Sequence, residues 1–159
     1  MKLATIFRKN VNEHLVKLTD QLVPMLSKLI EYNFPSEVVS LEFEVFTDGF
    51  TQEFPVRAFF MDSDNSEFFL YENNNAVYPS PIDPRLLEIP QVFSDEFEEK
   101  FIGKDEHLDT FTLAGYELIE WFKDCWLKAG GEKFKLKANI KLHGDIKELN
   151  LLSSEWVEW

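Results

Sequence analysis

Cysteine is almost absent from this chain of 159 residues, which contains only Cys125. One cysteine forms no internal disulfide and excludes a zinc site built from several cysteines, and such usage suits a reducing compartment. Hydrophobic runs are short as well. None approaches the ~18 residues of a membrane-spanning helix, and the apolar residues 3–7 are too few for the core of a signal peptide. We therefore expect a cytoplasmic protein.

Glycine and histidine are scarce, with six and three residues. Loops that cradle phosphate are rich in glycine and lead into helices. Because no such loop occurs, we expect no nucleotide, flavin or nicotinamide cofactor. His14, His107 and His143 are far apart in the sequence and form no pair with metal-ligand spacing. Residues 62–67 lack the glycine and the late glutamate of an EF-hand loop. We therefore expect no bound metal.

No catalytic nucleophile is recognisable. The chain has no Gly-x-Ser-x-Gly elbow. Cys125 falls on the apolar face of a predicted helix, where no neighbouring group would activate its thiol. Acidic pairs are numerous, but catalytic carboxylates must face each other across a cleft, which spacing along the chain does not reveal. We therefore name no catalytic residue and favour binding over catalysis.

Basic residues are rare in the middle of the chain. The net charge is −13, and residues 31–106 contain four basic and eighteen acidic groups, whereas residues 1–30 carry +3 and residues 107–159 carry −2. A negative field repels nucleic-acid phosphates and anionic lipid, so we expect neither nucleic acid nor a membrane as a partner. It attracts a basic protein. The simpler alternative is that the acidity only maintains solubility.

Aromatic residues, by contrast, are abundant. Hydrophobic residues make up 45% of the chain and aromatic residues 15%, with sixteen Phe. A chain of this length and composition can form one sizeable core. The Asn- and Pro-rich stretch 73–90 is the candidate boundary, but a division there would leave strands without a helix to cover them. We therefore predict a single domain over residues 1–159.

The spacing of apolar residues predicts helices. Residues 5–31 repeat apolar positions at intervals of three and four, and Pro24 predicts a kink or a junction of two helices between Thr19 and Pro24. A short helix is expected at 94–101. The long helix near 110–129 has an apolar face made of Phe111, Gly115, Leu118, Phe122, Cys125 and Ala129.

Alternating apolar residues predict strands. Asp48-Gly49 is typical of a tight hairpin turn. Glu42 and Glu44 would share a sheet face with the lysines of the last strand and form cross-strand ion pairs. A basic face for an anionic ligand is the alternative. The predicted strands are 39–46, 54–61, 67–72 and 133–142.

The sequence thus predicts an α+β fold. An antiparallel sheet of about four or five strands would be covered by the N-terminal helical segment and by the long helix near 110–129. In size, acidity and order of elements the chain is similar to small acidic bacterial proteins, among them toxin-neutralising immunity proteins. This likeness is one of general character over the whole chain. Since it rests on no diagnostic motif, it assigns no residue a role.

The function predicted first is that of a non-catalytic acidic protein, immunity-like in character, that engages a basic partner protein. Carboxylates of the middle segment would supply the field, and exposed tyrosines would supply the anchors. Two alternatives remain open: a small hydrolase or small-molecule-binding domain with a pocket under the 73–90 loop, and a subunit of a larger assembly. The predicted partner-binding residues are Glu42, Glu44, Asp48, Glu53, Asp62, Asp64, Glu67, Tyr71, Glu72 and Tyr78.

Overall fold

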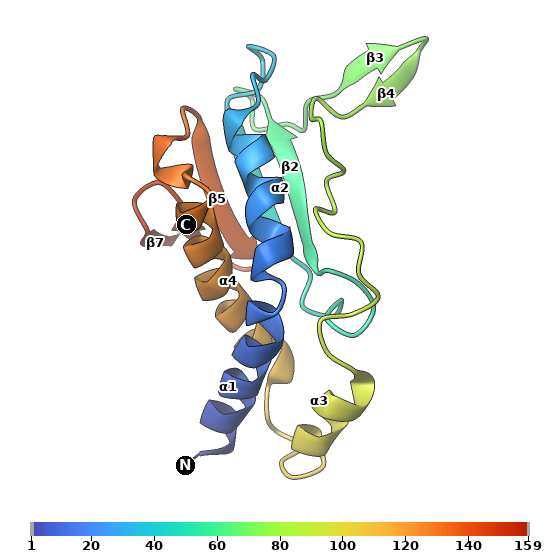
Figure 1. Cartoon of the computed structure of the whole chain (residues 1–159), viewed down its shortest axis with the longest axis vertical. Coiled ribbons are helices and arrows are strands. Elements are labelled where there is room, and N and C mark those ends of the chain that lie inside the picture. Colours follow the sequence, from blue (N-terminus) through green and yellow to red (C-terminus); the bar gives the residue numbers. More distant parts are fainter. Residues whose placement is uncertain (1, 159) are drawn as a thin grey trace.

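A computed structural model describes residues 2–158 and has an α+β architecture (Figure 1). The helices are α1 (Leu3–Val16), α2 (Thr19–Glu31), α3 (Asp95–Ile102), α4 (Thr110–Lys128) and the short 3₁₀ helix η1 (Gly131–Lys133). The strands are β1 (Ser40–Val45), β2 (Val56–Met61), β3 (Leu70–Glu72), β4 (Asn75–Val77), β5 (Lys137–Leu142), β6 (Lys147–Asn150) and β7 (Glu155–Glu158). The predicted fold class, a sheet covered by the N-terminal helices and a long later helix, is confirmed.

The five-stranded sheet has the order β2-β1-β5-β6-β7. The pair β1–β2 is antiparallel, as predicted, whereas β1 and β5 pair in parallel. Strands β6 and β7 extend the predicted sheet, and the pairs β5–β6 and β6–β7 are antiparallel. Parallel neighbours need a crossover connection, usually a helix. Helix α4 supplies this crossover, because it returns the chain to the end of the sheet at which β1 begins (Figure 1).

The N-terminal helical segment breaks at Lys17 and Leu18, just before the predicted junction. Pro24 lies inside α2 and cannot donate a hydrogen bond to the carbonyl of Asp20. Asp20 is exposed, so water can satisfy that carbonyl and the helix continues. None of the helices within residues 2–158 combines the length and the apolar character needed to span a bilayer.

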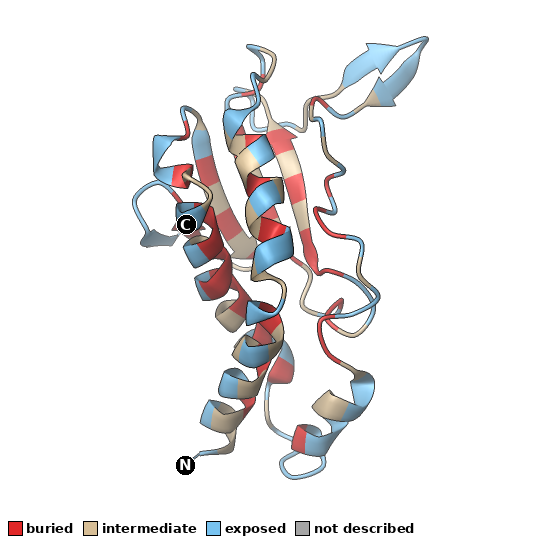
Figure 2. Cartoon of the chain, viewed as in Figure 1, coloured by how far each residue is buried: buried red, intermediate tan, exposed pale blue. Residues whose placement is uncertain are grey.

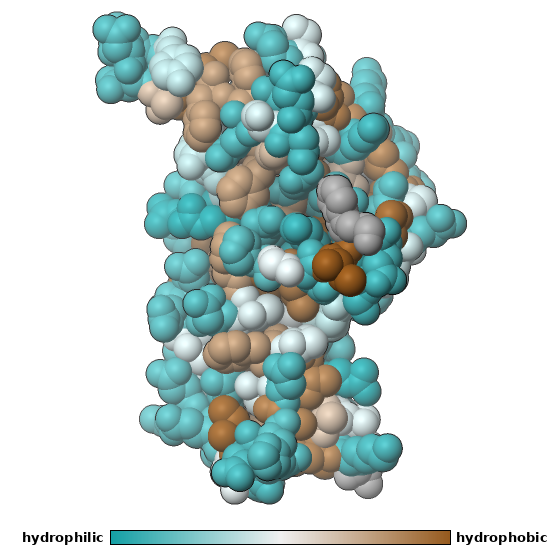
Figure 3. Space-filling model, turned by 180° about the vertical axis from the view of Figure 1, so that it is seen from behind, coloured by the Kyte–Doolittle hydropathy of each residue, from teal (hydrophilic) through white to brown (hydrophobic). Residues whose placement is uncertain are grey.

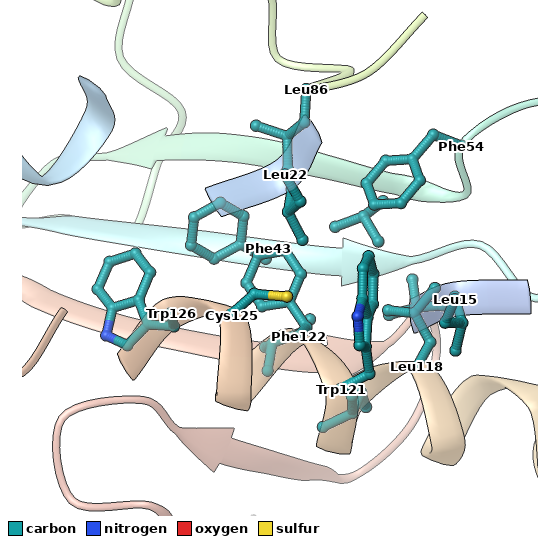
Figure 4. Packing of buried hydrophobic residues seen from close by; sticks show 14 of the residues in the cluster. Leu15, Leu22, Phe43, Phe54, Leu86, Leu118, Trp121, Phe122, Cys125 and Trp126 are labelled. Atoms are coloured by element: carbon teal, nitrogen blue, oxygen red, sulfur yellow. The ribbon is translucent and has the colours of Figure 1, made fainter. Parts of the chain in front are cut away.

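Helix α4 packs its apolar face on the sheet, as Figure 4 shows from close by. Phe122 is 0% exposed, and its ring centroid lies 4.9 Å from that of Phe43 in β1. Leu118 and Cys125 are buried beside it, as predicted. Phe111, the first residue of the predicted face, is instead 45% exposed. One turn later, Gly115 packs closely against Leu142, the last residue of β5, and Thr47, which follows β1.

The segment predicted as a third strand of the sheet, 67–72, forms a separate hairpin. Strand β3 pairs with β4 in a two-stranded sheet, and an isolated bridge between Met61 and Glu67 links the segment to β2. The backbone φ angles of Asn73 and Asn74 are 51° and 67°. Two successive left-handed residues suit the tight turn that matches strand twist, and asparagine tolerates that conformation. The Asn run is therefore a hairpin turn rather than part of an irregular loop.

The last predicted strand is shorter than expected, and the connection between the first two strands is longer than expected. Strand β5 begins at Lys137 rather than at residue 133, because residues 131–133 form η1. The β1–β2 connection is ten residues long rather than a tight Asp-Gly turn. It carries Phe50 and Phe54 into the core, where the ring of Phe50 stacks on Phe93 at 5.3 Å between centroids. Burying two aromatic rings outweighs the preference for a short turn.

Candidate functional site

The sheet has one covered face and one open face. On β1, Leu41, Phe43 and Val45 are buried beneath the helices, while Glu42 and Glu44 point to the other side. Figure 3 views the molecule from behind, on the side away from α1, α2 and α4, and hydrophilic residues cover much of that surface. The predicted alternation of β1 is therefore confirmed, and its polar positions lie on the open face.

Cross-strand charge pairing occurs on this open face. Glu44 stands opposite Lys141 in the β1–β5 register, and Lys141 Nζ lies 3.9 Å from Glu44 Oε1. The other carboxylate oxygen of Glu44 lies 3.2 Å from His143 Nδ1. The ring of His143 stacks on Phe46 with 4.7 Å between centroids. Of the predicted cross-strand ion pairs, Glu44 with Lys141 therefore forms, whereas Glu42 stands opposite Asn139.

A hollow of about 230 Å³ lies on the open face beside this pair. Burial raises the pKa of Glu42, and the neighbouring carboxylates of Glu148 and Glu44 raise it further. Burial also raises the pKa of Glu148. The hollow is lined by Glu42, Glu44, Asn65, Asn139, Lys141 and Glu148. The sequence did not single out Asn65, Asn139 or Glu148, because only the register of β5 and β6 and the path of the β2–β3 turn bring them together.

The turn at 62–66 is held by a side chain. Asp62 Oδ1 accepts hydrogen bonds from the backbone N–H groups of Asp64 at 2.9 Å and Ser66 at 3.0 Å, as in turns closed by aspartate. The predicted turn is confirmed, and it carries Asn65 to the open face. Asp62 therefore has a structural role, whereas the side chain of Asp64 faces solvent.

The β3–β4 hairpin projects from one end of the molecule, and almost all of it is exposed (Figures 1 and 2). Tyr71 is 73% exposed, and Glu72 beside it is also exposed. Tyr78 packs at the base of the hairpin, with its ring 5.4 Å from that of Phe69. Glu67 is half-buried at the same base, and burial raises its pKa.

Asp48 and Glu53 lie elsewhere. The register pairs Ser40 with Met61 and Val45 with Val56, so the β1–β2 loop and the 62–66 turn are at opposite ends of these strands. Both acidic residues line a separate hollow of about 220 Å³. Of the residues predicted to bind a partner, these two and Glu44, which lies next to the Val45–Val56 end of β1, are separated from the hairpin by the fold.

A hollow also exists under the later part of the 73–90 loop, with a volume of about 470 Å³ and lining residues 52–54, 85 and 87–90. Its arginine, Arg85, lies 3.2 Å from Asp83 and 3.8 Å from Glu88. A small-molecule pocket at this loop stays a prediction. A larger hollow, of about 570 Å³, lies between residues 30–38 and 133–136.

Two titratable groups have strongly shifted pKa values. Burial raises the pKa of the Cys125 thiol to about 11, which leaves little thiolate at neutral pH. Burial and the neighbouring Asp145 carboxylate raise the pKa of Tyr116 to about 12. Tyr116 donates its hydroxyl hydrogen bond to Asp145, and Lys147 Nζ lies 4.8 Å above its ring. The Tyr116 ring also packs edge-on against Trp156. Because Tyr116 belongs to α4 and Trp156 to β7, this contact packs β7 against α4.

Replacing Tyr116 with phenylalanine is expected to lower the free energy of unfolding by about 1 kcal/mol at neutral pH, because a hydrogen bond to a carboxylate is lost. That bond lowers the pKa of Asp145, so its stabilisation is present above the ordinary aspartate pKa and disappears as the pH falls below it. The raised pKa of Tyr116 makes stability decrease as the pH rises from 10 towards 12. Urea melts at several pH values measure both effects. Tyr71→Phe is the exposed control, and an equal loss in that variant would contradict the assignment.

Within residues 2–158, no group of three or more His, Cys, Asp or Glu side chains could hold a metal ion. No protein-family model matches the chain, and no curated protein or solved structure is detectably similar to it. The candidate site is therefore defined by its own chemistry: the glutamate-lined hollow, the 62–66 turn and the projecting hairpin.

Proposed function

We propose that this chain is a non-catalytic protein that binds a basic partner protein through its projecting hairpin. The contact region, called the hairpin surface below, comprises Asp62, Asp64, Glu67, Leu70, Tyr71, Glu72 and Tyr78. The observation that carries the proposal is the high exposure of Tyr71 on a hairpin that extends beyond the body of the protein. Tyrosine is among the residues that contribute most binding energy at protein interfaces.

The charge around the hairpin supports a basic partner. The sequence contains no Lys, Arg or His between Arg57 and Arg85, so the whole β2–β3–β4 segment lacks a compensating cation of its own. Complementary charge steers the encounter of two proteins and raises the association rate. A toxin that the chain neutralises is one partner of this kind. The alternative, a charge that maintains solubility, gives no reason for exposed tyrosine and leucine on the same hairpin.

The first step of the test is capture of partners from an extract of the native cell on immobilised protein. The Debye length is about 10 Å at 0.1 M ionic strength and about 3 Å at 1 M. A partner steered by the hairpin surface should therefore be retained at the lower salt concentration and released at the higher one. The captured protein is then purified for measurements of association rate.

Charge reversal at the hairpin surface is expected to slow association of that partner about tenfold or more at low salt. Asp64→Lys with Glu72→Lys is the suitable variant because both side chains are exposed. Glu42 and Glu44 are unsuitable, since they are half-buried and Glu44 is paired with Lys141 and His143. Stopped-flow or surface-based kinetics give the rate. The fold should persist, because exposed charges contribute little stability.

The control variant has the same change in net charge at the opposite end of the molecule. Glu99 on α3 and Glu106 in the loop after it are both exposed. Their replacement by lysine should change the association rate by less than about twofold, since α3 and the hairpin lie at opposite ends of the molecule (Figure 1) and salt screens distant charges. Two results would contradict the proposed binding surface. One is unchanged association of the hairpin variant at low salt, and the other is equal slowing in both variants, which would reflect net charge alone.

A further inference from the structure

The hollow on the open sheet face is made from three strands and a turn. Glu42 and Glu44 come from β1, Asn139 and Lys141 from β5, Glu148 from β6, and Asn65 from the β2–β3 turn. This group of six residues is called the glutamate pocket below. It adjoins the hairpin surface, because Asn65 belongs to the turn that Asp62 closes.

One acceptor in this pocket is buried without a donor. Asn139 Oδ1 has no hydrogen-bond partner within the described part of the chain, and the atom is fully buried. A buried acceptor that stays unsatisfied destabilises a fold, and native structures contain few of them. The β1–β5 register places Asn139 opposite Glu42. The unsatisfied oxygen and the carboxylate therefore lie together on the open face, and both are hydrogen-bond acceptors.

The charges of the pocket do not balance. It contains three carboxylates and one ammonium group, that of Lys141, which lies 3.9 Å from Glu44 Oε1 and whose charge also acts to lower the pKa values of Glu42 and Glu148. Glu42 and Glu148 repel each other, and burial and repulsion together raise the pKa of Glu42. A cation with several N–H groups would reduce this repulsion, and a turn of the Asn139 amide toward the hollow would let the same cation donate to its oxygen.

We propose that the glutamate pocket binds the guanidinium head of an arginine side chain of the basic partner. Guanidinium is planar and presents five N–H donors in a fixed arrangement that matches carboxylates. Glu42, Glu148 and Asn139 Oδ1 supply acceptors from three neighbouring positions of the sheet. The inference rests on the proposed function: the hairpin surface makes the broad contact, and the pocket receives one side chain beside it.

The test uses methylguanidinium chloride as the probe and the full chain labelled with ¹⁵N. At constant ionic strength, the side-chain amide signals of Asn139 and Asn65 should shift and saturate, with a Kd on the order of millimolar. Methylammonium should bind several-fold more weakly, and tetramethylammonium, which has no N–H donor, should produce no saturable shift. Saturation by tetramethylammonium would overturn the proposal, because the pocket would then respond only to charge. Methylammonium binding as tightly as methylguanidinium would overturn the assignment to guanidinium.

Glu148→Gln keeps the shape of the side chain and removes one charge, and it should weaken methylguanidinium binding about tenfold, since an ion pair is replaced by a hydrogen bond from the cation to a neutral amide. Glu42→Gln is the second variant if Glu148→Gln disturbs the sheet, which the backbone signals would reveal. The matched control is Glu99→Gln on α3, which removes the same charge at an exposed position outside both the pocket and the hairpin surface. Equal weakening by this control would overturn the proposal.

The outcomes separate this inference from the proposed function. If reversal at Asp64 and Glu72 slows the partner but methylguanidinium gives no saturable shift, the hairpin remains the binding surface and the pocket assignment falls. If methylguanidinium binds in the pocket but no salt-sensitive basic protein is captured, the pocket is supported and the proposed function falls.

Discussion

Replacing Phe122 with alanine is expected to lower the free energy of unfolding by about 3–5 kcal/mol, as removal of a large ring from a core does. Phe122 is fully buried at the centre of the helix–sheet interface and contacts the Phe43 ring. The surrounding side chains come from α2, α4 and the sheet (Figure 4). Because these elements are fixed by their own packing, they cannot collapse fully into the space left by the ring.

Urea melts followed by circular dichroism measure this loss. Phe111→Ala is the matched control on the same helix, because its ring is largely exposed and its removal should cost less than about 1 kcal/mol. A loss below about 1 kcal/mol in Phe122→Ala would mean that the ring is not part of a packed core. A similar loss in both variants would mean that helix propensity, rather than burial, decides the effect.

Gly131→Ala is expected to cost about 2–3 kcal/mol, which is large for the addition of one methyl group. A Cβ atom at this position would lie 2.1 Å from Trp126 Nε1 and 2.2 Å from Trp126 Cδ1. Trp126 is fully buried and is packed by the rings of Phe43 and Phe134, so the indole cannot move aside without displacing them. Forcing extra volume into a packed core typically costs 1–3 kcal/mol.

Gly130→Ala is the control for backbone strain. Gly130 has a φ of 90°, but an added Cβ would meet no atom within 4 Å, so only the left-handed conformation is penalised, by about 1–2 kcal/mol. A second test is the double variant Gly131→Ala with Trp126→Phe, in which the smaller ring should recover part of the loss and give a non-additive cycle. If Gly131→Ala costs no more than Gly130→Ala, the contact with Trp126 is not the cause.

The local spacing of apolar residues predicted the helices and strands that have one buried face and one exposed face. Helix α4 has one apolar face over many turns and a capping aspartate, Asp109, whose side chain accepts from Thr112 N, so its extent was predicted to within a residue or two. Strand β1 alternates because one face is buried and the other open. The start of β5 was predicted four residues too early. Polar and apolar residues already alternate from Lys133, although Lys133 is the last residue of η1, the short helix whose Gly131 packs against Trp126.

Pairing between distant strands could not be predicted in the same way. The alternation of β5 fits a parallel or an antiparallel neighbour equally well, and the choice depends on the crossover through α4. The sequence of the segment that contains β3 predicts another strand of the main sheet. The turn at Asn73 and Asn74 instead pairs β3 with β4 in a separate hairpin. Asparagine supplies the left-handed conformation less distinctively than glycine, so the sequence signal for this hairpin was weak.

The candidate site was predicted in part. The acidic residues and tyrosines of the hairpin surface follow from charge and composition, and the fold brings most of them to one end of the molecule. The glutamate pocket depends on Asn139, which β1–β5 pairing places opposite Glu42, and on Glu148, which β5–β6 pairing brings beside them. His143 was set aside because it has no metal-ligand spacing in the sequence, and its partner Glu44 is distant along the chain. Contacts of this kind are set by tertiary register rather than by any local pattern.

The parallel pairing of β1 with β5 has a consequence for synthesis of the chain. Val45 ends β1 and Lys137 begins β5, and at 5–20 residues per second the ribosome needs roughly 5–20 s to produce the intervening segment. Throughout that interval β1 and β2 can pair with each other, but the other edge of β1 has no strand beside it. Exposed strand edges are templates for association with other chains. The nascent protein is therefore most vulnerable to aggregation before α4 and β5 emerge. At that stage the acidic segment 31–106 has already been synthesised, and its net negative charge repels other copies.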